Sequence, residues 1–374
     1  MFQWGVAPVL SQGGLDCLAG KGYVPGSTTL LDDSLQPLWD SLAEFLPRWL
    51  APNCVTLLGL APVLVAYCFL CICCPSFSEP VPQWQLAFFG LSSLFYFAMD
   101  NLDGKQARRT GSSSPLGHLF DHGVDTLVVM PYHAFVIHGV LGLGATRLML
   151  LTQLIVQTSF FMAQWQERYT SICPNAGISE MCLLGSGLVL LASTVRWEVL
   201  QGLLSQTLFA GLSIRELLLC ALILNGIMYL CYFAWNTLRA ARRQQALGRA
   251  LAELVPFAAM LCGLLLWEEQ VIEAAALPIS VLMGILACFC TWQHIVFTMA
   301  GEVFHAVQPL VLLYVILAAI STAMPAASLR RLQVAIVPCA ALAIAASARW
   351  ICCIIHQIKG RLGIQVLRIS YHKD

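Results

Sequence analysis

Four aspartates between residues 100 and 125 have the residue type and the spacing that metal-dependent chemistry requires. Asp100 and Asp103 are three residues apart, whereas Asp121 and Asp125 are four residues apart. Either spacing places both carboxylates of a pair on one face of a helix. Four carboxylates at a membrane boundary would repel each other and lose hydration, and a divalent cation removes both penalties. The pattern therefore predicts Mg²⁺ or Mn²⁺, with two ions that clamp a phosphoanhydride.

The same segment also concentrates basic residues. It reads "DNLDGKQARRTGSSSPLGHLFDHGVDT" and includes Lys105, Arg108 and Arg109. We predict that these three side chains lie in a connecting loop, residues 102–116, where they hold the phosphates of a nucleotide. A surface loop of mutually paired charges is the simpler alternative. It does not explain carboxylates that follow one stripe inside an apolar span.

The composition indicates a protein embedded in a membrane. Hydrophobic residues make up 59% of the 374-residue chain and charged residues only 11%, compared with about 25% charged in a typical soluble domain. The net charge is zero, so no basic surface indicates nucleic acid as a partner. We predict an all-α, polytopic integral membrane protein with about ten transmembrane helices of ~20 residues each. Their predicted ranges are 54–74, 83–101, 117–140, 147–166, 178–195, 215–238, 248–267, 274–299, 306–324 and 333–357.

The residues before the first span form an N-terminal segment, 1–52. In "SLQPLWDSLAEFLPRWL", apolar side chains recur at helical spacing and acidic ones lie on the opposite side. This pattern predicts an amphipathic helix that lies in the membrane interface. We assign residues 53–374 to one transmembrane domain, with its catalytic part at about 53–200. The sixteen cysteines match no zinc-binding spacing and are interpreted as apolar filler between helices.

The distribution of Lys and Arg predicts the orientation in the membrane. With ten spans, both termini and the 102–116 loop share one side of the bilayer. That side carries fourteen Lys and Arg residues and the other side carries five, with Arg349 inside the last span. The positive-inside rule therefore places the charged loop in the cytosol.

The charged segment resembles the signature of the CDP-alcohol phosphotransferase family, D-x-x-D-G-x-x-A-R-x(8)-G-x-x-x-D-x-x-x-D. The strings "DGKQARRT", "PLG" and "LFDHG", together with "RWLAPNCVTLLGL" at residues 48–60, resemble its eukaryotic choline/ethanolamine branch. The close match covers roughly residues 30 to 130, and the remainder is similar mainly in architecture. Every position of the signature is filled, by Asp100, Asp103, Gly104, Ala107, Arg108, Gly117, Asp121 and Asp125.

The resemblance implies a reaction. Phosphocholine or phosphoethanolamine would pass from CDP-choline or CDP-ethanolamine to diacylglycerol, giving phosphatidylcholine or phosphatidylethanolamine and CMP. In the family the four aspartates bind two divalent cations, Mg²⁺ or Mn²⁺. We expect such an enzyme to be a homodimer among the lipids of the endoplasmic reticulum or the Golgi, with its active site facing the cytosol.

The resemblance also implies roles for individual residues. His122 is the expected base that takes the proton of the diacylglycerol hydroxyl, and the alternative is that it orients Asp121. Asn53 and Arg108 are expected to hold the CDP group. The further substrate-binding residues expected from the segment are Gly104, Lys105 and Gly117. Gly104 would also let the facing helix backbones approach closely.

One position departs from the branch. The usual string is "PLGELFDHG", and His118 replaces its glutamate. In the family this glutamate lies near the nucleotide, so His118 is expected among the substrate-binding residues. The replacement removes a negative charge, and we expect it to change headgroup preference, nucleotide affinity or rate.

Two other functions fit parts of the pattern. A synthase of the same family that uses inositol or glycerophosphate would carry the signature, but those chains usually have about six spans. An ion or proton transporter would use the carboxylates as a relay, but transporters place their charges near the bilayer midplane and within internal repeats. Here the charges gather at one edge of the apolar spans, which favours the choline/ethanolamine reaction.

Overall fold

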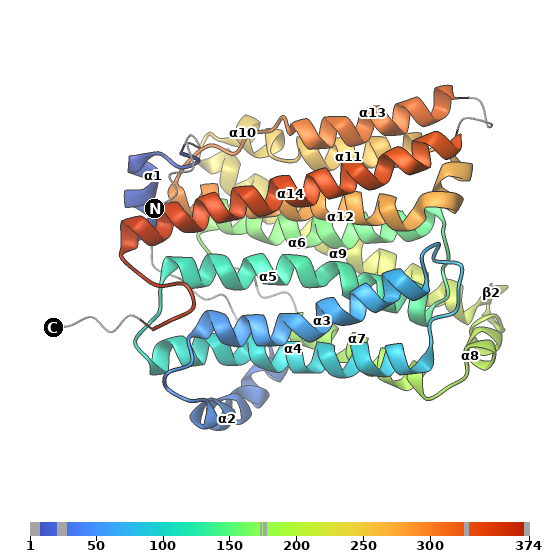
Figure 1. Cartoon of the computed structure of the whole chain (residues 1–374), viewed down its shortest axis with the longest axis horizontal. Coiled ribbons are helices and arrows are strands. Elements are labelled where there is room, and N and C mark those ends of the chain that lie inside the picture. Colours follow the sequence, from blue (N-terminus) through green and yellow to red (C-terminus); the bar gives the residue numbers. More distant parts are fainter. Residues whose placement is uncertain (1–7, 21–27, 173, 175–177, 325–328, 370–374) are drawn as a thin grey trace.

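The protein is a bundle of long helices that run side by side (Figure 1). The computed structural model describes residues 8–20, 28–172, 174, 178–324 and 329–369, and within these ranges the strands form one short hairpin. The elements are α1 (Gln12–Gly20), α2 (Leu30–Phe45), α3 (Pro52–Cys73), α4 (Gln83–Arg109), α5 (Pro115–Ala134), the π-helix η1 (Phe135–Val140), α6 (Arg147–Thr170), α7 (Ile178–Ser193), α8 (Trp197–Leu204), β1 (Thr207–Phe209), β2 (Leu212–Ser213), α9 (Ile214–Arg243), α10 (Leu247–Ala252), α11 (Val255–Leu266), α12 (Glu269–Ala300), α13 (Pro309–Ala323) and α14 (Leu329–Leu362).

The prediction of an all-α membrane protein is confirmed. Within the described ranges, five helical segments are long and apolar enough to cross a bilayer, and each of the ten predicted ranges overlaps a helix. Large apolar side chains of α9 face outward, with Leu224 65% exposed and Trp235 69% exposed. A soluble protein rarely exposes so continuous an apolar surface, whereas lipid accommodates it. The full number of ten transmembrane helices stays a prediction.

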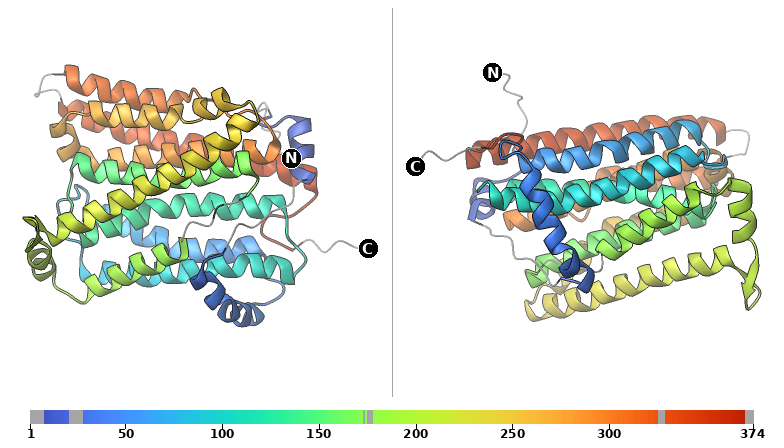
Figure 2. Two further views of the ribbon diagram at one scale, coloured as in Figure 1. Left: turned by 180° about the vertical axis from the view of Figure 1, so that it is seen from behind. Right: turned by 90° about the horizontal axis from the view of Figure 1, so that it is seen from below.

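The predicted amphipathic helix is present as α2. Its N-terminus carries a capping box in which Thr29 and Asp32 bond to each other's backbone N–H groups. The side chain of Trp39 is buried edge-on against Phe97 of α4. Other apolar side chains, such as Phe45 at 83% exposure, remain on the surface. The helix runs obliquely across the long helices (Figure 2), and its position in the membrane interface stays a prediction.

The prediction of a connecting loop at residues 102–116 is wrong. Helix α4 continues to Arg109 and α5 begins at Pro115, so only residues 110–114 connect them. The string "GKQARR" consists mostly of good helix formers, and charge alone does not end a helix. The turn comes at Gly111, which has a positive φ of 63°. Ser114 then caps α5 by accepting a hydrogen bond from the Gly117 N–H at 3.1 Å.

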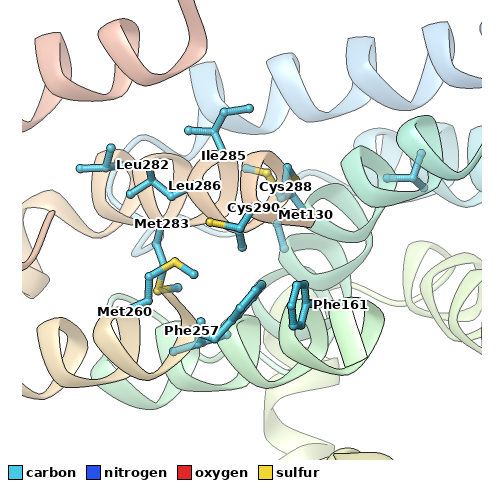
Figure 3. Packing of buried hydrophobic residues seen from close by; sticks show 14 of the residues in the cluster. Met130, Phe161, Phe257, Met260, Leu282, Met283, Ile285, Leu286, Cys288 and Cys290 are labelled. Carbon is cyan, nitrogen blue, oxygen red and sulfur yellow. The ribbon is translucent and has the colours of Figure 1, made fainter. Parts of the chain in front are cut away.

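Part of the hydrophobic core lies where α5, α6, α11 and α12 meet (Figure 3). Phe161 of α6 packs against Phe257 of α11, with ring centroids 4.4 Å apart. Cys288 and Cys290 of α12 are fully buried in the same cluster. These two thiols therefore act as the apolar filler that the sequence predicts.

Both ends of the described chain lie at the end of the bundle where α4 ends and α5 begins (Figure 1). The Gln357 side chain of α14 accepts a hydrogen bond from the Val9 N–H at 3.0 Å, and Asn53 at the start of α3 donates to the Val366 carbonyl at 2.9 Å. The β-hairpin lies at the opposite end. Of the Lys and Arg residues assigned to the cytosolic side, Lys21 and Lys373 lie outside the described residues.

This arrangement predicts the sidedness of the two ends. A glycosylation acceptor inserted in the exposed turn at Ala210 and Gly211 should be modified in microsomes, because the positive-inside rule puts the hairpin in the lumen. The sequence contains no acceptor of its own, so any modification reports the insert. The matched control is the same acceptor appended after Asp374, which should stay unmodified. The reverse pattern would contradict the predicted orientation.

Candidate active site

The structure brings three of the four predicted metal ligands together. Asp100 and Asp103 of α4 and Asp121 of α5 each offer a carboxylate oxygen, and these oxygens lie within 4.8 Å of one another. The fourth aspartate, Asp125, lies one turn further along α5 and interacts electrostatically with Asp121 and Asp100. Asp103 is 6% exposed and the others are half-buried. Two helices thus present four carboxylates to one small volume.

Two hydroxyl groups orient the outer members of this cluster, and sequence reasoning missed both. The Thr56 hydroxyl of α3 donates to Asp103 Oδ2 at 2.5 Å, and the Tyr96 hydroxyl of α4 donates to Asp125 Oδ1 at 2.6 Å. Tyr96, Asp100 and Asp103 follow the i, i+4, i+7 spacing of one helix face. This spacing could have predicted from the sequence that Tyr96 lies beside the two aspartates. The contact of Thr56 becomes evident only from the packing of α3 against α4.

A close approach of α3 to α4 makes the Thr56 contact possible. Gly59, one turn after Thr56, has no side chain, and a Cβ atom there would lie 2.8 Å from Met99 Cβ and 3.3 Å from Tyr96 Cα. Such distances are too short for any larger residue without a shift of the backbone. Gly59 therefore sets how near α3 comes to the helix that carries Asp100 and Asp103.

The cluster fits a divalent cation. Among the described residues, Asp100 Oδ1 is buried and accepts no hydrogen bond. A buried carboxylate oxygen without a donor is costly unless a cation or another donor satisfies it. The group contains only carboxylates, and oxygen ligands of this kind suit Mg²⁺ or Mn²⁺. No cysteine belongs to either candidate metal cluster found in the described part of the chain.

The basic side chains of the segment separate into two groups. Lys105 Nζ contacts Asp40 Oδ1 at 2.5 Å and Gln36 Oε1 at 2.7 Å, both on α2. Arg109 donates to the carbonyl of Leu46 just after α2 at 2.6 Å. These two cations therefore fasten α2 to the end of α4. Arg108 is exposed, one turn after Gly104 on α4, which leaves its guanidinium accessible to a ligand.

The two predicted glycines differ in their surroundings. A Cβ atom on Gly117 would lie 3.8 Å from the Asn53 amide oxygen, so the start of α3 and the start of α5 are neighbours. A Cβ atom on Gly104 would meet only the Arg108 guanidinium within 4 Å. The expectation that Gly104 allows two backbones to approach is therefore wrong, because among the described residues no backbone atom of a facing helix lies within 4 Å of that Cβ position. The close approach occurs at Gly59 instead.

His122 lies beside the acidic cluster. Its Nδ1 is 3.5 Å from Asp121 Oδ2, and its side chain is 12% exposed. The ring of His118 packs against it with centroids 4.1 Å apart, and His118 Nε2 is 4.0 Å from Glu167 Oε1 of α6. The Trp292 indole of α12 donates to the Gly123 carbonyl at 2.8 Å, which helps fix the rotation of α5. The sequence did not single out Glu167, whose partner lies on another helix.

Comparison with known proteins identifies the segment that carries this site. The family model described as "CDP-alcohol phosphatidyltransferase" matches residues 49–208. Residues 49–208 of this chain are therefore similar to the CDP-alcohol phosphatidyltransferase family. This confirms the resemblance inferred from the signature, and the four aspartates, both histidines and Asn53 all lie within the matched range.

The similar proteins include named enzymes. The chain is 37% identical over 171 residues to an uncharacterized CDP-alcohol phosphatidyltransferase class-I family protein 3 of Dictyostelium discoideum, covering 44% of this chain and 41% of that protein. It is 44% identical over 118 residues to cholinephosphotransferase 1 of Homo sapiens, covering 32% and 29%. For cholinephosphotransferase 1 of Gallus gallus the identity is 44% over 124 residues, covering 33% and 37%. The chain thus spans less than half the length of each of these relatives.

The hydrogen bond from Tyr96 generates a prediction. Tyr96→Phe should leave the helix packing intact but weaken divalent-cation binding by roughly 10- to 100-fold, as is usual when a residue that orients a metal ligand is removed. The measurement is the Mg²⁺ or Mn²⁺ concentration that gives half of the cation-dependent rise in unfolding temperature of the purified protein.

The control for Tyr96→Phe is Tyr132→Phe. The Tyr132 hydroxyl bonds to Ser93 and Ser186 rather than to an aspartate, so this variant loses a hydroxyl from a neighbouring helix contact. Its cation dependence should match that of the unaltered protein. Equal cation dependence in both variants and the unaltered chain would show that Tyr96 does not support a metal ligand.

Proposed function

We propose that this chain transfers phosphocholine or phosphoethanolamine from the CDP-alcohol to diacylglycerol, giving phosphatidylcholine or phosphatidylethanolamine and CMP. The observation that carries the proposal is the convergence of Asp100, Asp103 and Asp121 beside His122. An acidic cluster explains how a pyrophosphate is held, and an imidazole next to it explains how a hydroxyl is activated. The similarity to cholinephosphotransferases, 44% identity over 118 and 124 residues for two of them, supports the choice of reaction.

Divalent cations held by the four aspartates, two Mg²⁺ or Mn²⁺ ions, would neutralise the pyrophosphate and stabilise charge on the departing CMP. The protein itself supplies and positions the side chain that accepts the proton. His122 takes the proton of the diacylglycerol hydroxyl, and Asp121, with Oδ2 at 3.5 Å from Nδ1, orients the ring and stabilises its charged form. The hydroxyl oxygen bonds to the phosphorus that carries the amino alcohol. The bond from that phosphorus to CMP breaks, and CMP leaves.

The nucleotide is proposed to lie where the starts of α3 and α5 meet the end of α4. Asn53 and Gly117 are neighbours there, and the exposed Arg108 extends from α4 next to Gly104. Arg108 suits a phosphate because its guanidinium offers a fork of donors. Lys105 would have to leave Asp40 to contact substrate, so its predicted binding role requires a rearrangement of α2.

The proposal also includes the orientation of the site, the membrane in which the protein lies and its oligomeric state. The site faces the cytosol, where CDP-alcohols are accessible, and the membrane is that of the endoplasmic reticulum or the Golgi. The functional unit is a homodimer, and its partners are the CDP-alcohol, diacylglycerol and surrounding lipids. The catalytic part is placed at about residues 53–200, within and close to the matched segment.

An assay of the purified chain tests the reaction. With diacylglycerol and Mg²⁺ present, CDP-choline or CDP-ethanolamine should yield the corresponding phospholipid and CMP in equal amounts. Asp100→Asn, Asp103→Asn, Asp121→Asn and Asp125→Asn should each abolish product formation, because each removes negative charge from the cation site. Asp16→Asn is the matched control, since Asp16 is exposed and pairs with Arg361 outside the cluster. Product formation in excess chelator would refute the metal-dependent proposal.

His122→Ala tests the proposed base. The maximal rate should fall by roughly 10²- to 10⁴-fold while CDP-alcohol affinity changes little, because proton transfer belongs to the transition state. The measurement is the rate at saturating substrate together with the affinity for the CDP-alcohol. His356→Ala, at an exposed histidine of α14, is the control and should keep the normal rate. Near-normal turnover of His122→Ala would show that His122 is not the base, and Asp125 would then be the next candidate.

A further inference from the structure

Three side chains beside the acidic cluster form a second group of metal-binding type. His118 and His122 are one turn apart on α5, and Glu167 reaches them from α6. One ligand atom of each residue lies within 4.8 Å of the others. The exposed fractions of the side chains are only 12% for both histidines and 19% for Glu167. The group is therefore a preformed and largely enclosed set of donors.

The donors of this group differ in kind from those of the aspartate cluster. Two imidazoles and one carboxylate are the ligand set of open, three-coordinate zinc sites, which leave a fourth position for water or another ligand. Nitrogen ligands favour Zn²⁺ over Mg²⁺, because Mg²⁺ prefers oxygen. Asp121 Oδ2, at 3.5 Å from His122 Nδ1, supplies the carboxylate that commonly orients a metal-bound histidine.

The contact between His118 and Glu167 requires only a small side-chain movement to fit a zinc ion. Zinc bonds of about 2.0–2.1 Å place tetrahedral ligand atoms roughly 3.4 Å apart. His118 Nε2 and Glu167 Oε1 are 4.0 Å apart, so this contact must shorten by about half an ångström. The contact is too long for a good hydrogen bond.

This chain owes the nitrogen-rich set to the residue at position 118. A glutamate there would face Glu167 across the gap between α5 and α6 and repel it. Histidine removes that repulsion and adds a second imidazole one turn from His122. The histidine at position 118 and the position of Glu167 thus have one common explanation.

We propose that His118, His122 and Glu167 bind one Zn²⁺ ion and that zinc bound there inhibits the transfer reaction. A lone pair of His122 that is bonded to zinc cannot accept the proton of a hydroxyl. The inhibition rests on the proposed function, whereas the binding of zinc does not. Zinc is therefore a regulator that acts on the base and leaves the aspartate cluster in place.

The binding test uses Co²⁺ and Zn²⁺ with the purified full-length protein in detergent. Millimolar Mg²⁺ is present throughout, so that the oxygen cluster is occupied. Co²⁺ should give the visible absorption of a site with nitrogen and oxygen ligands, without the intense bands of thiolate ligation, and Zn²⁺ should displace it. His118→Ala and Glu167→Gln should each weaken binding by at least about 10-fold through loss of a ligand. His356→Ala and Asp103→Asn should leave it unchanged.

An exchange variant distinguishes the loss of a zinc ligand from a failure to fold. His118→Glu combined with Glu167→His retains two imidazoles and one carboxylate but exchanges their positions between α5 and α6. It should bind Co²⁺ with the same type of spectrum. Unaltered binding in both single variants, or loss of binding in the exchange variant with its fold retained, would overturn the proposal.

A second measurement separates this inference from the proposed function. In the transferase assay with fixed Mg²⁺, Zn²⁺ should inhibit the unaltered enzyme, and Glu167→Gln should need about 10-fold more Zn²⁺ for the same inhibition. Zinc binding in a chain without transferase activity would support the site and refute the proposed reaction. Transferase activity that Zn²⁺ inhibits equally in both proteins would refute the inhibitory site.

Discussion

The rest of the structure depends on the burial of four carboxylates at one end of two apolar helices. Charges in such a place are costly, and the neighbouring elements reduce that cost at specific atoms. Thr56 and Tyr96 each donate a hydrogen bond to one aspartate. Gly59 allows α3 to come near enough for the first of these bonds. Asp100 Oδ1 stays without a donor among the described residues, which is the feature expected of a ligand kept for a cation.

Helix α5 serves two groups of side chains because of its periodicity. Asp121 and Asp125 are one turn apart and meet α4, whereas His118 and His122 are also one turn apart and are directed toward α6. Adjacent residues on a helix differ in direction by about 100°, so the two pairs face different neighbours while Asp121 and His122 stay in contact. The Trp292–Gly123 hydrogen bond holds α5 against α12. A single helix thereby positions both the acidic cluster and the proposed base.

Local patterns in the sequence were sufficient for the long apolar helices, for α2 and for the pairing of aspartates on the faces of α4 and α5, because each depends on the spacing of residues within one helix. The 102–116 loop was predicted wrongly, because charged residues were taken as the end of a helix when they only mark the end of its apolar part. The contacts of Lys105 with Asp40 and of His118 with Glu167 join distant parts of the chain. The spacing of residues within one helix cannot predict these contacts. It also cannot predict the close approach of α3 to α4 at Gly59.

The attachment of α2 to α4 has a consequence for the proposed reaction, whose reactants come from two phases. Lys105 and Arg109 bind α2, and Gln106 donates to the carbonyls of Pro47 and Leu50 at 2.9 Å. The segment therefore cannot change its depth in the membrane without moving the end of α4. Exposed Phe45 and Trp49 favour the boundary between lipid and water. If α2 lies in the interface as predicted, these side chains set the height of the carboxylates at the level where the proposed nucleotide and lipid substrates can both arrive.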